Sequence, residues 1–374
     1  MDGIGLLTGQ ENRMKIAFLN DGIYEYASGL PHAVGGAERD QWLLARALVV
    51  AGWSATVGVR KYLEFAERRV IDGVEYVGIG DRYVLAAWHR FLTAERPKWL
   101  FWECAYHLWG PLVEIAKFTG VNTIFHAAFD LDVQPRHALV LRPRWWPLYA
   151  WGLARTDRIF VQHAGQLSGL SPRLRTKARV LPKVCISEIN GDLTSVKSHF
   201  ERENYVAWVG RLVQFKRPDV LVEIARKAPK IRFVVCGGIR PDSTNGKIVN
   251  DLRATPNIEY LGQVAPDKAQ QVIADACLLL STSDVEGFPN TFVQAWSSGT
   301  PVISLNVDPD QIISKSHLGV VTSNCEHVRA EIEALMESPD RRQEMAIRAR
   351  HHVVENYSAA AVVKIFEDAL GSIS

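Results

Sequence analysis

Short runs of apolar residues alternate with segments in which apolar residues recur at helical spacing along most of the chain. One amphipathic helix is predicted between residues 37 and 50. Its apolar positions at helical spacing are Trp42, Leu43, Ala45, Leu48 and Val49. The apolar runs predict strands at 15–20, 54–59, 98–103, 121–126 and 158–162, and then at 205–209, 231–236, 257–261, 277–281 and 301–304. Alternating strands and helices are typical of α/β domains built on parallel sheets.

The alternation forms two arrays, which a polar and mixed stretch at 186–203 separates. We interpret that stretch as an interdomain connection, because a chain of 374 residues is long enough for two domains. The sequence therefore predicts an α/β protein with two doubly wound domains and a cleft between them. Residues 1–13 are interpreted as a polar leader. Sheets of this kind bind ligands beyond the carboxyl ends of their strands.

Composition limits the class of protein. Hydrophobic residues make up 47% of the chain and charged residues 22%, as in soluble globular proteins. No run of 18 apolar residues predicts a membrane span, and the first residues do not resemble a secretory signal peptide. Five cysteines without a CxxC motif indicate neither a disulfide framework nor a zinc site. We therefore expect a cytoplasmic protein with reduced thiols and no cofactor.

A net charge of +2 conceals one strongly basic segment. Residues 133–183 carry ten Lys or Arg residues and a single acid, Asp157. The large aromatic residues among them are Trp145, Trp146, Tyr149 and Trp151. Two interpretations stay open: a solvated face with some packed aromatic rings, or a surface that meets an anionic membrane from its inner side or a phosphorylated lipid. No recognition motif accompanies the charge, so nucleic acid is not an expected partner.

The residues with the most informative chemistry lie at 284–294. Their sequence, DVEGFPNTFVQ, predicts a Gly/Pro loop that runs into a short helix ending at Gly299. Unpaired N–H groups at such a helix start suit a phosphate. Glu286 cannot bind an anion, and its carboxylate is better matched to the hydroxyls of a sugar. The stretch predicts a nucleotide-sugar site, and an ordinary loop between strand and helix is the alternative.

A second loop strengthens that prediction. The strand at 205–209 ends at Gly210, and Arg211 and Lys216 flank the turn that follows. Two cations at the carboxyl end of a buried strand suit a diphosphate, which arginine binds with its fork and lysine as a point charge. A solvated basic turn is the simpler interpretation.

Taken in order, these motifs resemble those of the GT-B-fold retaining glycosyltransferases of family 4. The resemblance rests on Gly210-Arg211 with Lys216, and on Glu286-Gly287-Phe288-Pro289 with seven residues between Glu286 and Gln294. Further similar stretches are Gly35-Gly36-Ala37-Glu38-Arg39, residues 155–162, and Tyr357-Ser358 at the start of the last helix. The resemblance implies two Rossmann-like domains facing across a cleft: an acceptor-side domain at 14–185 and a nucleotide-sugar domain at 186–355. The helix in 356–374 would cross back to the first domain.

The resemblance also implies an activity. It is the metal-independent, retaining transfer of a hexose from a nucleotide-diphosphate sugar to a glycan or lipid-linked acceptor in polysaccharide or glycolipid assembly. Arg211 and Lys216 would stabilise the leaving diphosphate, Glu286 would hold sugar hydroxyls, and His126 would contact the transferred sugar. His107 is a weaker candidate than His126. The remaining donor-binding residues would be Gly35, Gly36, Gly210, Gly287, Phe288, Asn290, Thr291 and Gln294.

Two features depart from a simple match. The family usually has a second glutamate where this chain has Gln294, and a neutral amide holds a ribose hydroxyl more weakly, by about 1 kcal/mol. Asp130-Leu131-Asp132 is a DxD motif, the metal signature of another glycosyltransferase fold, but it is far in sequence from the phosphate loops. We therefore expect no metal. A sugar-nucleotide-binding protein without transferase activity and a sugar-nucleotide epimerase remain alternatives.

Overall fold

The computed structural model forms two compact units. It describes residues 13–30, 35–80, 82–185, 202–239 and 246–371. Unit 1 contains residues 1–184 and 359–374, and unit 2 contains residues 185–358. The predicted leader, apart from Arg13, and the predicted connection, apart from its last two residues, lie outside the described residues. Each unit has its own sheet and its own hydrophobic core.

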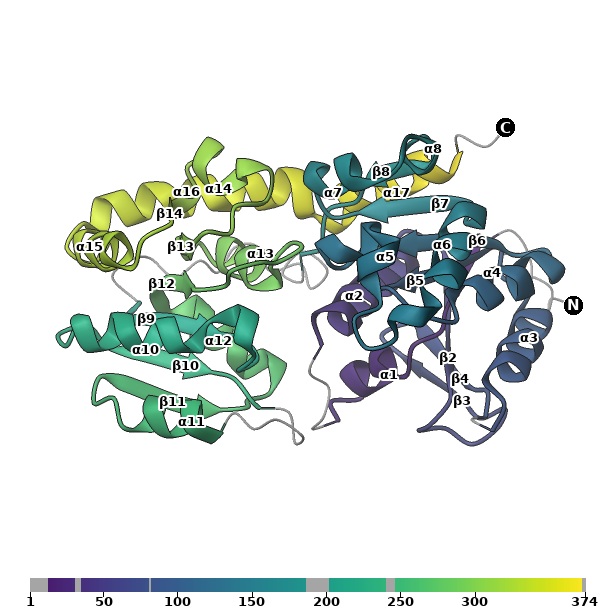
Figure 1. Ribbon diagram of the computed structural model, residues 1–374, viewed down its shortest axis with the longest axis horizontal. Coiled ribbons are helices and arrows are strands. Elements are labelled where there is room, and N and C mark those ends of the chain that lie inside the picture. The colour runs from purple at the N-terminus through teal and green to yellow at the C-terminus, as the bar shows by residue number, and fades with distance from the viewer. Residues whose placement is uncertain (1–12, 31–34, 81, 186–201, 240–245, 372–374) are drawn as a thin grey trace, which may run out of the picture. The chain divides into compact units, whose positions relative to one another are not determined.

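The sheet of unit 1 has eight strands in the order β3-β4-β2-β1-β5-β6-β7-β8 (Figure 1). The strands are β1 Lys15–Phe18, β2 Ser54–Val59, β3 Arg68–Ile71, β4 Val74–Gly78, β5 Trp99–Glu103, β6 Asn122–His126, β7 Arg158–Val161 and β8 Ala178–Val180. All neighbouring pairs are parallel except β3 with β4. That pair is a hairpin, and both of its turn residues, Asp72 and Gly73, have positive φ angles of 52° and 77°.

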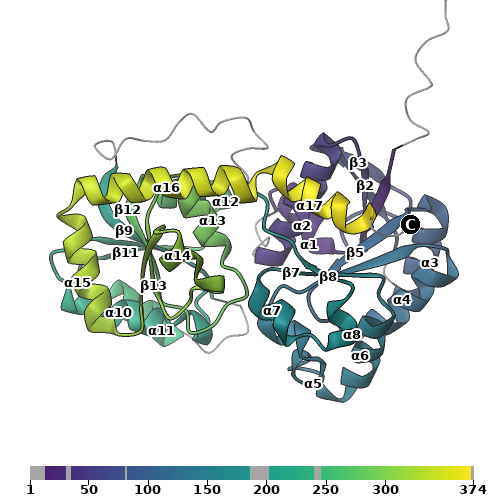
Figure 2. The same ribbon diagram turned by 90° about the horizontal axis from the view of Figure 1, so that it is seen from above.

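Helices cover both faces of this sheet (Figure 2). They are α1 Asp21–Ala27, α2 Gly36–Val50, α3 Val84–Glu95, α4 Trp109–Phe118, η1 Asp130–Val133, α5 Pro135–Ala138, η2 Pro143–Trp145, α6 Trp146–Arg155, α7 Ala164–Gly169, α8 Pro172–Arg175 and α17 Ala359–Gly371. Helices α2 and α17 pack together, while α3, α4 and α6 form a second packed row. Residues 359–371 therefore complete a fold whose other elements come from the first half of the chain.

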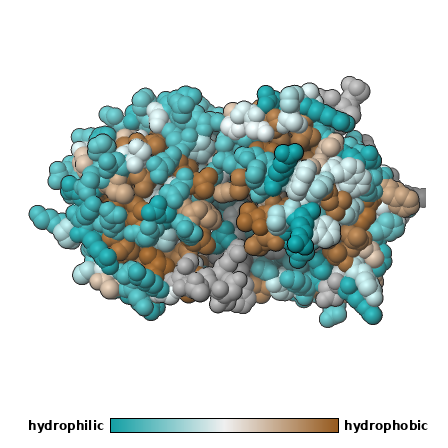
Figure 3. Space-filling view, viewed as in Figure 1, coloured by the Kyte–Doolittle hydropathy of each residue, from teal (hydrophilic) through white to brown (hydrophobic). Residues whose placement is uncertain are grey.

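The surface over α5, η2 and α6 mixes hydrophobic and basic side chains. Figure 3 shows hydrophobic and hydrophilic residues side by side in this part of unit 1. Val140 and Leu141 are 72% and 92% exposed, and Arg142 and Arg144 beside them are exposed as well. The predicted solvated face is thus not uniformly polar.

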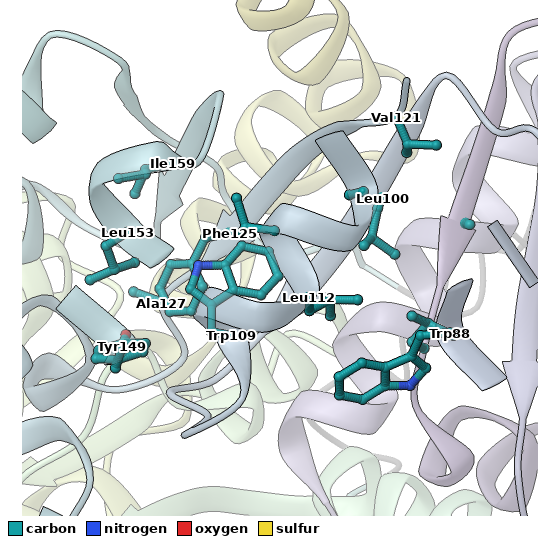
Figure 4. Packing of buried hydrophobic residues seen from close by; sticks show 14 of the residues in the cluster. Trp88, Leu100, Trp109, Leu112, Val121, Phe125, Ala127, Tyr149, Leu153 and Ile159 are labelled. Atoms are coloured by element: carbon teal, nitrogen blue, oxygen red, sulfur yellow. The ribbon is translucent and has the colours of Figure 1, made fainter. Parts of the chain in front are cut away.

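The core between the sheet and the row of α3, α4 and α6 is built around Trp109 (Figure 4). Its ring lies 5.6 Å from that of Phe125 in β6, which in turn lies 5.8 Å from the ring of Tyr149 in α6. The indole N–H of Trp109 donates to Oγ1 of Thr156 at 3.1 Å. Burial of large aromatic side chains with their polar atoms satisfied is a major source of stability.

Lys177 is one of the ten cations of the basic segment, and it has a structural role. Its ammonium group donates to the carbonyl oxygens of Leu153 at 3.0 Å and Ala154 at 2.9 Å, and also to that of Thr156. These carbonyls lie at the C-terminal end of α6, where a cation satisfies unpaired acceptors and interacts favourably with the helix dipole. Burial lowers the pKa of Lys177 to about 8.

The sheet of unit 2 has six parallel strands in the order β11-β10-β9-β12-β13-β14. The strands are β9 Glu203–Val209, β10 Phe233–Cys236, β11 Ile258–Gly262, β12 Ala276–Ser281, β13 Val302–Leu305 and β14 Gly319–Thr322. The helices are η4 Gln214–Lys216, α10 Pro218–Lys227, α11 Gly246–Arg253, α12 Pro266–Asp275, α13 Asn290–Ser297, η5 Pro309–Gln311, α14 Ile312–Lys315, α15 Cys325–Met336 and α16 Pro339–Tyr357.

Side chains of β9 alternate between two cores. Val206 and Trp208 pack in the cluster that α10, α11 and α15 cover, whereas Tyr205 and Ala207 pack in the cluster that α12, α13 and α16 cover. A strand buried on both faces is expected to be apolar throughout, as this one is. Unit 2 is therefore doubly wound around β9.

All ten predicted strands are present, with ends that differ by at most two residues, and the helix predicted at 37–50 begins at Gly36. The structure adds strands that the sequence analysis did not predict, namely β3, β4, β8 and β14. The structure also adds a helix before Gly35, α1, which the sequence analysis did not predict. Its start is capped by Asn20, whose side chain accepts from the N–H of Gly22.

Strand order fixes one special position in each sheet. In unit 1 the chain proceeds outward from β1 to β2 and β4, and then returns to β5 on the other side of β1. In unit 2 it proceeds from β9 to β10 and β11, and then returns to β12 on the other side of β9. At such switch points the following loops diverge and leave room for a ligand. Among the described residues, no helix is long and apolar enough to cross a membrane.

Candidate active site

The loops after β9 and β12 flank the switch point of unit 2 and are joined by several hydrogen bonds. The N–H of Asp284 donates to the carbonyl oxygen of Phe215 at 2.9 Å. Oγ1 of Thr282 lies 2.7 and 2.9 Å from the carbonyl oxygens of Lys216 and Arg217, and it accepts from the indole N–H of Trp208 at 2.9 Å. These bonds fix the relative position of the two loops that carry the residues predicted to bind phosphate and sugar.

Lys216 and Glu286 form an ion pair between the two loops. Oε1 of Glu286 accepts from Nζ of Lys216 and also from the hydroxyl of Ser283, at 2.8 Å. Both side chains keep some contact with solvent, at 19% and 12% exposure. Two residues that are 70 positions apart in the sequence are thereby brought together at the carboxyl ends of adjacent strands.

The loop after β9 carries three cations, which differ in how many carboxylates they contact. Arg217 binds the carboxylates of Asp219 at 2.9 Å and Asp284 at 3.2 Å, and these contacts raise its pKa above the ordinary value. Arg211, by contrast, makes no side-chain hydrogen bond or ion pair with the described residues. The structure therefore distinguishes Arg217, which has two carboxylate partners, from Lys216, which has one, and from Arg211, which has none among the described residues.

The residues from Gly287 to Gln294 divide into two groups. Gly287 and Phe288 are buried, and the ring of Phe288 packs 5.7 Å from that of Tyr357, so only its backbone can face a ligand. Pro289 precedes the first residue of α13, where its missing N–H leaves no backbone donor unused. The other members, Asn290, Thr291 and Gln294, are partly exposed on α13. The side-chain amide of Gln294 makes no hydrogen bond with the described part of the chain. The backbone carbonyl oxygen of Gln294 accepts from the side-chain amide of Gln270 at 3.2 Å.

A close approach of backbone segments occurs at Gly210, and the residue that permits it is Gly237. A Cβ atom at Gly237 would lie 2.1 Å from the carbonyl oxygen of Gly210, so no side chain fits there. A Cβ atom at Gly210 itself would meet only ordinary contacts, the nearest at 3.5 Å from Trp208. The sequence analysis did not select Gly237, although the Gly-Gly pair after a buried strand was visible.

In unit 1, the glycine pair 35–36 forms the start of α2. Gly35 caps the helix with extended φ and ψ angles of −130° and 140°. Oε2 of Glu38 lies 1.4 Å from the position that a Cβ atom at Gly35 would take, so the carboxyl of the same helix fills the space beside this residue. A side chain at Gly35 would therefore have to displace the flexible end of Glu38. Any ligand that approaches Gly35 or Gly36 meets this carboxyl as well.

His126 is the last residue of β6, and its closest polar neighbour was missed by the sequence analysis. Nδ1 of His126 lies 3.4 Å from Oε1 of Glu103, the last residue of β5. The pair is buried, and Phe101 lies on one side of the imidazole with a ring separation of 5.8 Å. Burial and the nearby ammonium of Lys183 lower the pKa of His126 to about 3, so the ring is neutral. His107 lies elsewhere, against Trp145 at 5.5 Å and Arg142 at 3.2 Å.

Both carboxylates of the DxD motif serve as internal hydrogen-bond acceptors. Asp132 is buried and accepts from the N–H groups of Ala128 at 2.8 Å, Phe129 at 3.0 Å and Ala105 at 3.3 Å. Asp130 lies 2.9 Å from Nε2 of His163 and accepts from Gln166 at 3.1 Å. Within the described ranges, no group of three or more His, Cys, Asp or Glu residues is arranged to hold a metal ion.

Comparison with known proteins gives a consistent class for this fold and site. Residues 192–352 match the family model of the glycosyl transferases group 1. The chain is 25% identical over 226 residues to the poly(ribitol-phosphate) alpha-N-acetylglucosaminyltransferase of Staphylococcus aureus (strain COL). That match covers 56% of this chain and 45% of the relative, so the chain spans less than half of the relative's length.

Solved structures extend the similarity to nearly the whole chain. Sucrose-phosphate synthase from Thermosynechococcus elongatus superposes with a TM-score of 0.73 at 14% identity, covering 97% of this chain and 100% of that one. Anabaena HepE in complex with UDP-glucose superposes with a TM-score of 0.71 at 15% identity, covering 96% and 100%. The GT-B fold predicted from the sequence is confirmed. With the family match, these similarities support a glycosyltransferase of group 1.

The contacts of Asp132 predict that Asp132→Ala destabilises unit 1. The substitution leaves three backbone N–H groups without their acceptor, and we expect a loss of about 2–4 kcal/mol in the free energy of unfolding. Chemical denaturation followed by tryptophan fluorescence measures this loss. Asp130→Ala is the matched control, because its side chain is 37% exposed and its loss should cost about 1 kcal/mol or less. Equal stability of the two variants would contradict this account of Asp132.

Proposed function

We propose that this chain is a retaining, metal-independent glycosyltransferase. It would transfer a hexose from a nucleotide-diphosphate sugar, bound by unit 2, to a glycan or lipid-linked acceptor, bound by unit 1. The observation that carries the proposal is the Lys216–Glu286 ion pair at the switch point between β9 and β12. The fold and the family match support the same class, and a structurally similar protein is known in complex with UDP-glucose.

The ion pair leaves binding capacity on both of its members. An ammonium group has three N–H donors, and Lys216 uses one of them on Glu286, so two remain for phosphate oxygens. Glu286 uses Oε1 for Lys216 and Ser283, which leaves Oε2 to accept from a sugar hydroxyl. In this proposal Lys216 fixes the orientation of Glu286 while both contact the donor.

Charge balance supports a role for the same residues in departure of the diphosphate. Lys216 is offset by Glu286 and Arg217 by its two aspartates, so Arg211 supplies the uncompensated positive charge of the loop. A preorganised cation that meets developing negative charge is a strong source of transition-state stabilisation. Together with the N–H groups before α13, Arg211 and Lys216 would supply the charge that a metal ion supplies in other enzymes.

The proposed reaction requires no protein nucleophile. The bond between the sugar C1 and the diphosphate oxygen breaks, and a bond between C1 and the acceptor oxygen forms on the same face of the ring. The acceptor proton passes to the departing phosphate oxygen. The configuration at C1 is therefore retained, and the protein acts by positioning the groups and by stabilising charge.

A panel of nucleotide sugars separates this function from its alternatives. Nucleotide released only when an acceptor is present indicates transfer, an isomerised donor indicates an epimerase, and binding alone indicates a protein without transferase activity. NMR of the product's anomeric proton reports whether configuration is retained. Activity that survives treatment with EDTA supports a metal-independent reaction, whereas restoration only by added Mn²⁺ or Mg²⁺ would contradict it.

Replacing Arg211 or Lys216 by Ala should lower kcat by about 100- to 1,000-fold, as expected for loss of one preorganised charge-stabilising group. Steady-state kinetics with the preferred donor measures the change. Arg217→Ala is the matched control on the same loop, and its kcat should stay within a few-fold of the native value because Arg217 is already neutralised. A double Arg211→Ala, Lys216→Ala variant with nearly native kcat would exclude the diphosphate assignment.

Gln294→Glu should tighten nucleotide binding modestly, by about tenfold at most, because a carboxylate is a stronger acceptor than an amide. The partly exposed side chain of Gln294 has no hydrogen bond within the described residues that the substitution would break. Calorimetry with the preferred nucleotide measures the change. Weaker binding by the variant would mean that the amide N–H groups of Gln294 donate to the ligand.

We further propose that unit 1 attaches reversibly to anionic membranes, which would give access to a lipid-linked acceptor. The structure narrows the basic segment considerably, because several of its cations have internal partners. Lys183 pairs with Asp40 and Arg155 with Glu114, while Lys177 caps α6. The exposed cations that remain near α5 and η2 are Arg136, Arg142 and Arg144. They surround Val140, Leu141 and Trp145, whose exposure suits insertion at an interface.

Binding to vesicles that contain anionic lipid should exceed binding to neutral vesicles and should weaken as salt rises. Each cation near such a surface contributes roughly 1 kcal/mol, so three suffice for reversible attachment. Co-sedimentation measures the bound fraction. Charge reversal at Arg142 and Arg144 should release the protein without changing donor hydrolysis, whereas Arg173→Glu, an exposed control in α8, should not. Equal or absent binding to both vesicle types would leave a soluble acceptor as the better proposal.

A further inference from the structure

The carboxyl ends of β5 and β6 bring together two ionisable side chains that no step of the proposed reaction has yet explained. Glu103 and His126 are register partners in the two adjacent parallel strands. Strand β5 borders β1 at the switch point of unit 1, so the pair lies beside the position where a sheet of this kind binds ligands. In unit 2 the loops that carry Lys216 and Glu286 follow the switch-point strands β9 and β12 themselves.

Burial of the unit 1 pair is nearly complete. The side chain of Glu103 has no exposed surface, and that of His126 is 7% exposed. Among the described residues, neither carboxyl oxygen of Glu103 has a hydrogen-bond partner, and neither does Nε2 of His126. Oε1 lies 3.4 Å from Nδ1 of the imidazole, so a shift of a few tenths of an ångström brings the two atoms into hydrogen-bond range.

Surrounding charges do not supply a counter-ion for Glu103. The groups that act on it electrostatically are Asp40 and Glu38 of α2, Lys183 after β8, and Asp132 in η1, together with His126 itself. Three of these are acids, and the ammonium of Lys183 is already paired with Asp40. An ionised carboxylate without donors in a buried site is very costly, so such a group takes up a proton instead.

We propose that Glu103 is a positioning residue. Its carboxyl group stays protonated, and its O–H donates a hydrogen bond to Nδ1 of His126. A neutral imidazole has one N–H group, so this hydrogen bond fixes the hydrogen on Nε2. His126 then presents an N–H donor to an oxygen atom of the transferred sugar. This inference rests on the proposed function for the identity of the ligand, but the tautomer itself is a property of the free protein.

Electrostatics at the pair agree with this geometry. Burial and the nearby carboxyl of Asp40 raise the pKa of Glu103 well above its ordinary range, and burial lowers that of His126. Both shifts favour the uncharged form of the group concerned, which agrees with a carboxyl proton placed between Glu103 and Nδ1 of His126. If Glu103 were ionised, Nδ1–H would donate to it, and Nε2 would become an acceptor. The protonation state of Glu103 thus decides which sugar atom His126 can bind.

The tautomer can be measured directly by NMR of the full chain with ¹⁵N-labelled histidine and no substrate. A protonated and an unprotonated imidazole nitrogen have well-separated chemical shifts, and the His126 signals are assigned by their absence in His126→Gln. We expect Nε2 to be protonated and Nδ1 unprotonated at neutral pH. A protonated Nδ1 would overturn the proposal, whatever the enzyme's substrate proves to be.

Two variants test whether the tautomer matters for activity. Glu103→Gln keeps a neutral N–H donor, so His126 should keep its tautomer and kcat/KM should stay within about threefold. Glu103→Leu removes the donor, and we expect mixed tautomers and a loss of about tenfold or more in kcat/KM, with thermal unfolding used to verify that the variant is folded. Glu103→Gln with the same loss as Glu103→Leu would contradict the proposal.

A pH profile adds a readout that a purely structural role would not change. The raised pKa means that Glu103 loses its proton at a higher pH than an ordinary glutamate does, and there the tautomer should switch and activity should fall. Glu103→Gln cannot titrate and should lack this high-pH limb. If the variant retained the native limb, Glu103 would not control His126. If no donor supported turnover at all, the proposed function would fail while the NMR result still stood.

Discussion

Parallel strands end at one edge of a sheet, and this constraint determines where each unit of the protein can gather ligand-binding side chains. In each sheet the order in which successive strands are added reverses at one point, between β1 and β5 in unit 1 and between β9 and β12 in unit 2. The loops that follow diverge there, so polar groups can gather without opening the hydrophobic cores on either face. Lys216 and Glu286 lie in the loops after β9 and β12, and Glu103 and His126 are the last residues of β5 and of its neighbour β6. The same topological rule thus generates both sites.

The two sites solve the problem of burying charge in opposite ways. In unit 2 the charges are opposite, partly exposed and directly paired, so each offsets the other and both groups keep spare hydrogen-bonding capacity. In unit 1 the groups are fully buried among acids, and the lower cost lies with a neutral carboxyl and a neutral imidazole. The first arrangement suits a charged diphosphate. The second suits an uncharged sugar, for which a directed hydrogen bond matters more than charge.

Sequence patterns were sufficient for most of the framework. Most of the ten predicted strands are buried runs of apolar residues, although β11 is only partly buried, and such runs need no tertiary information to be recognised. The β3–β4 hairpin was missed although Asp72-Gly73 is a strong two-residue turn sequence, because its strands are partly polar at the sheet edge. Helix α1 was missed because its seven residues are too few to show a helical period.

By itself, the sequence determined the positions of ten strands, the two loops with Arg211, Lys216 and Glu286, and the resemblance to a GT-B glycosyltransferase. Those features are local, since each depends on residues within a few positions of one another. Only the tertiary structure decided which charges are free. It joined Lys216 to Glu286, neutralised Arg217, gave both DxD carboxylates internal donors, and placed Glu103 beside His126. The ion pairs and the burial of these side chains depend on residues distant in the chain, so a local sequence pattern does not predict them.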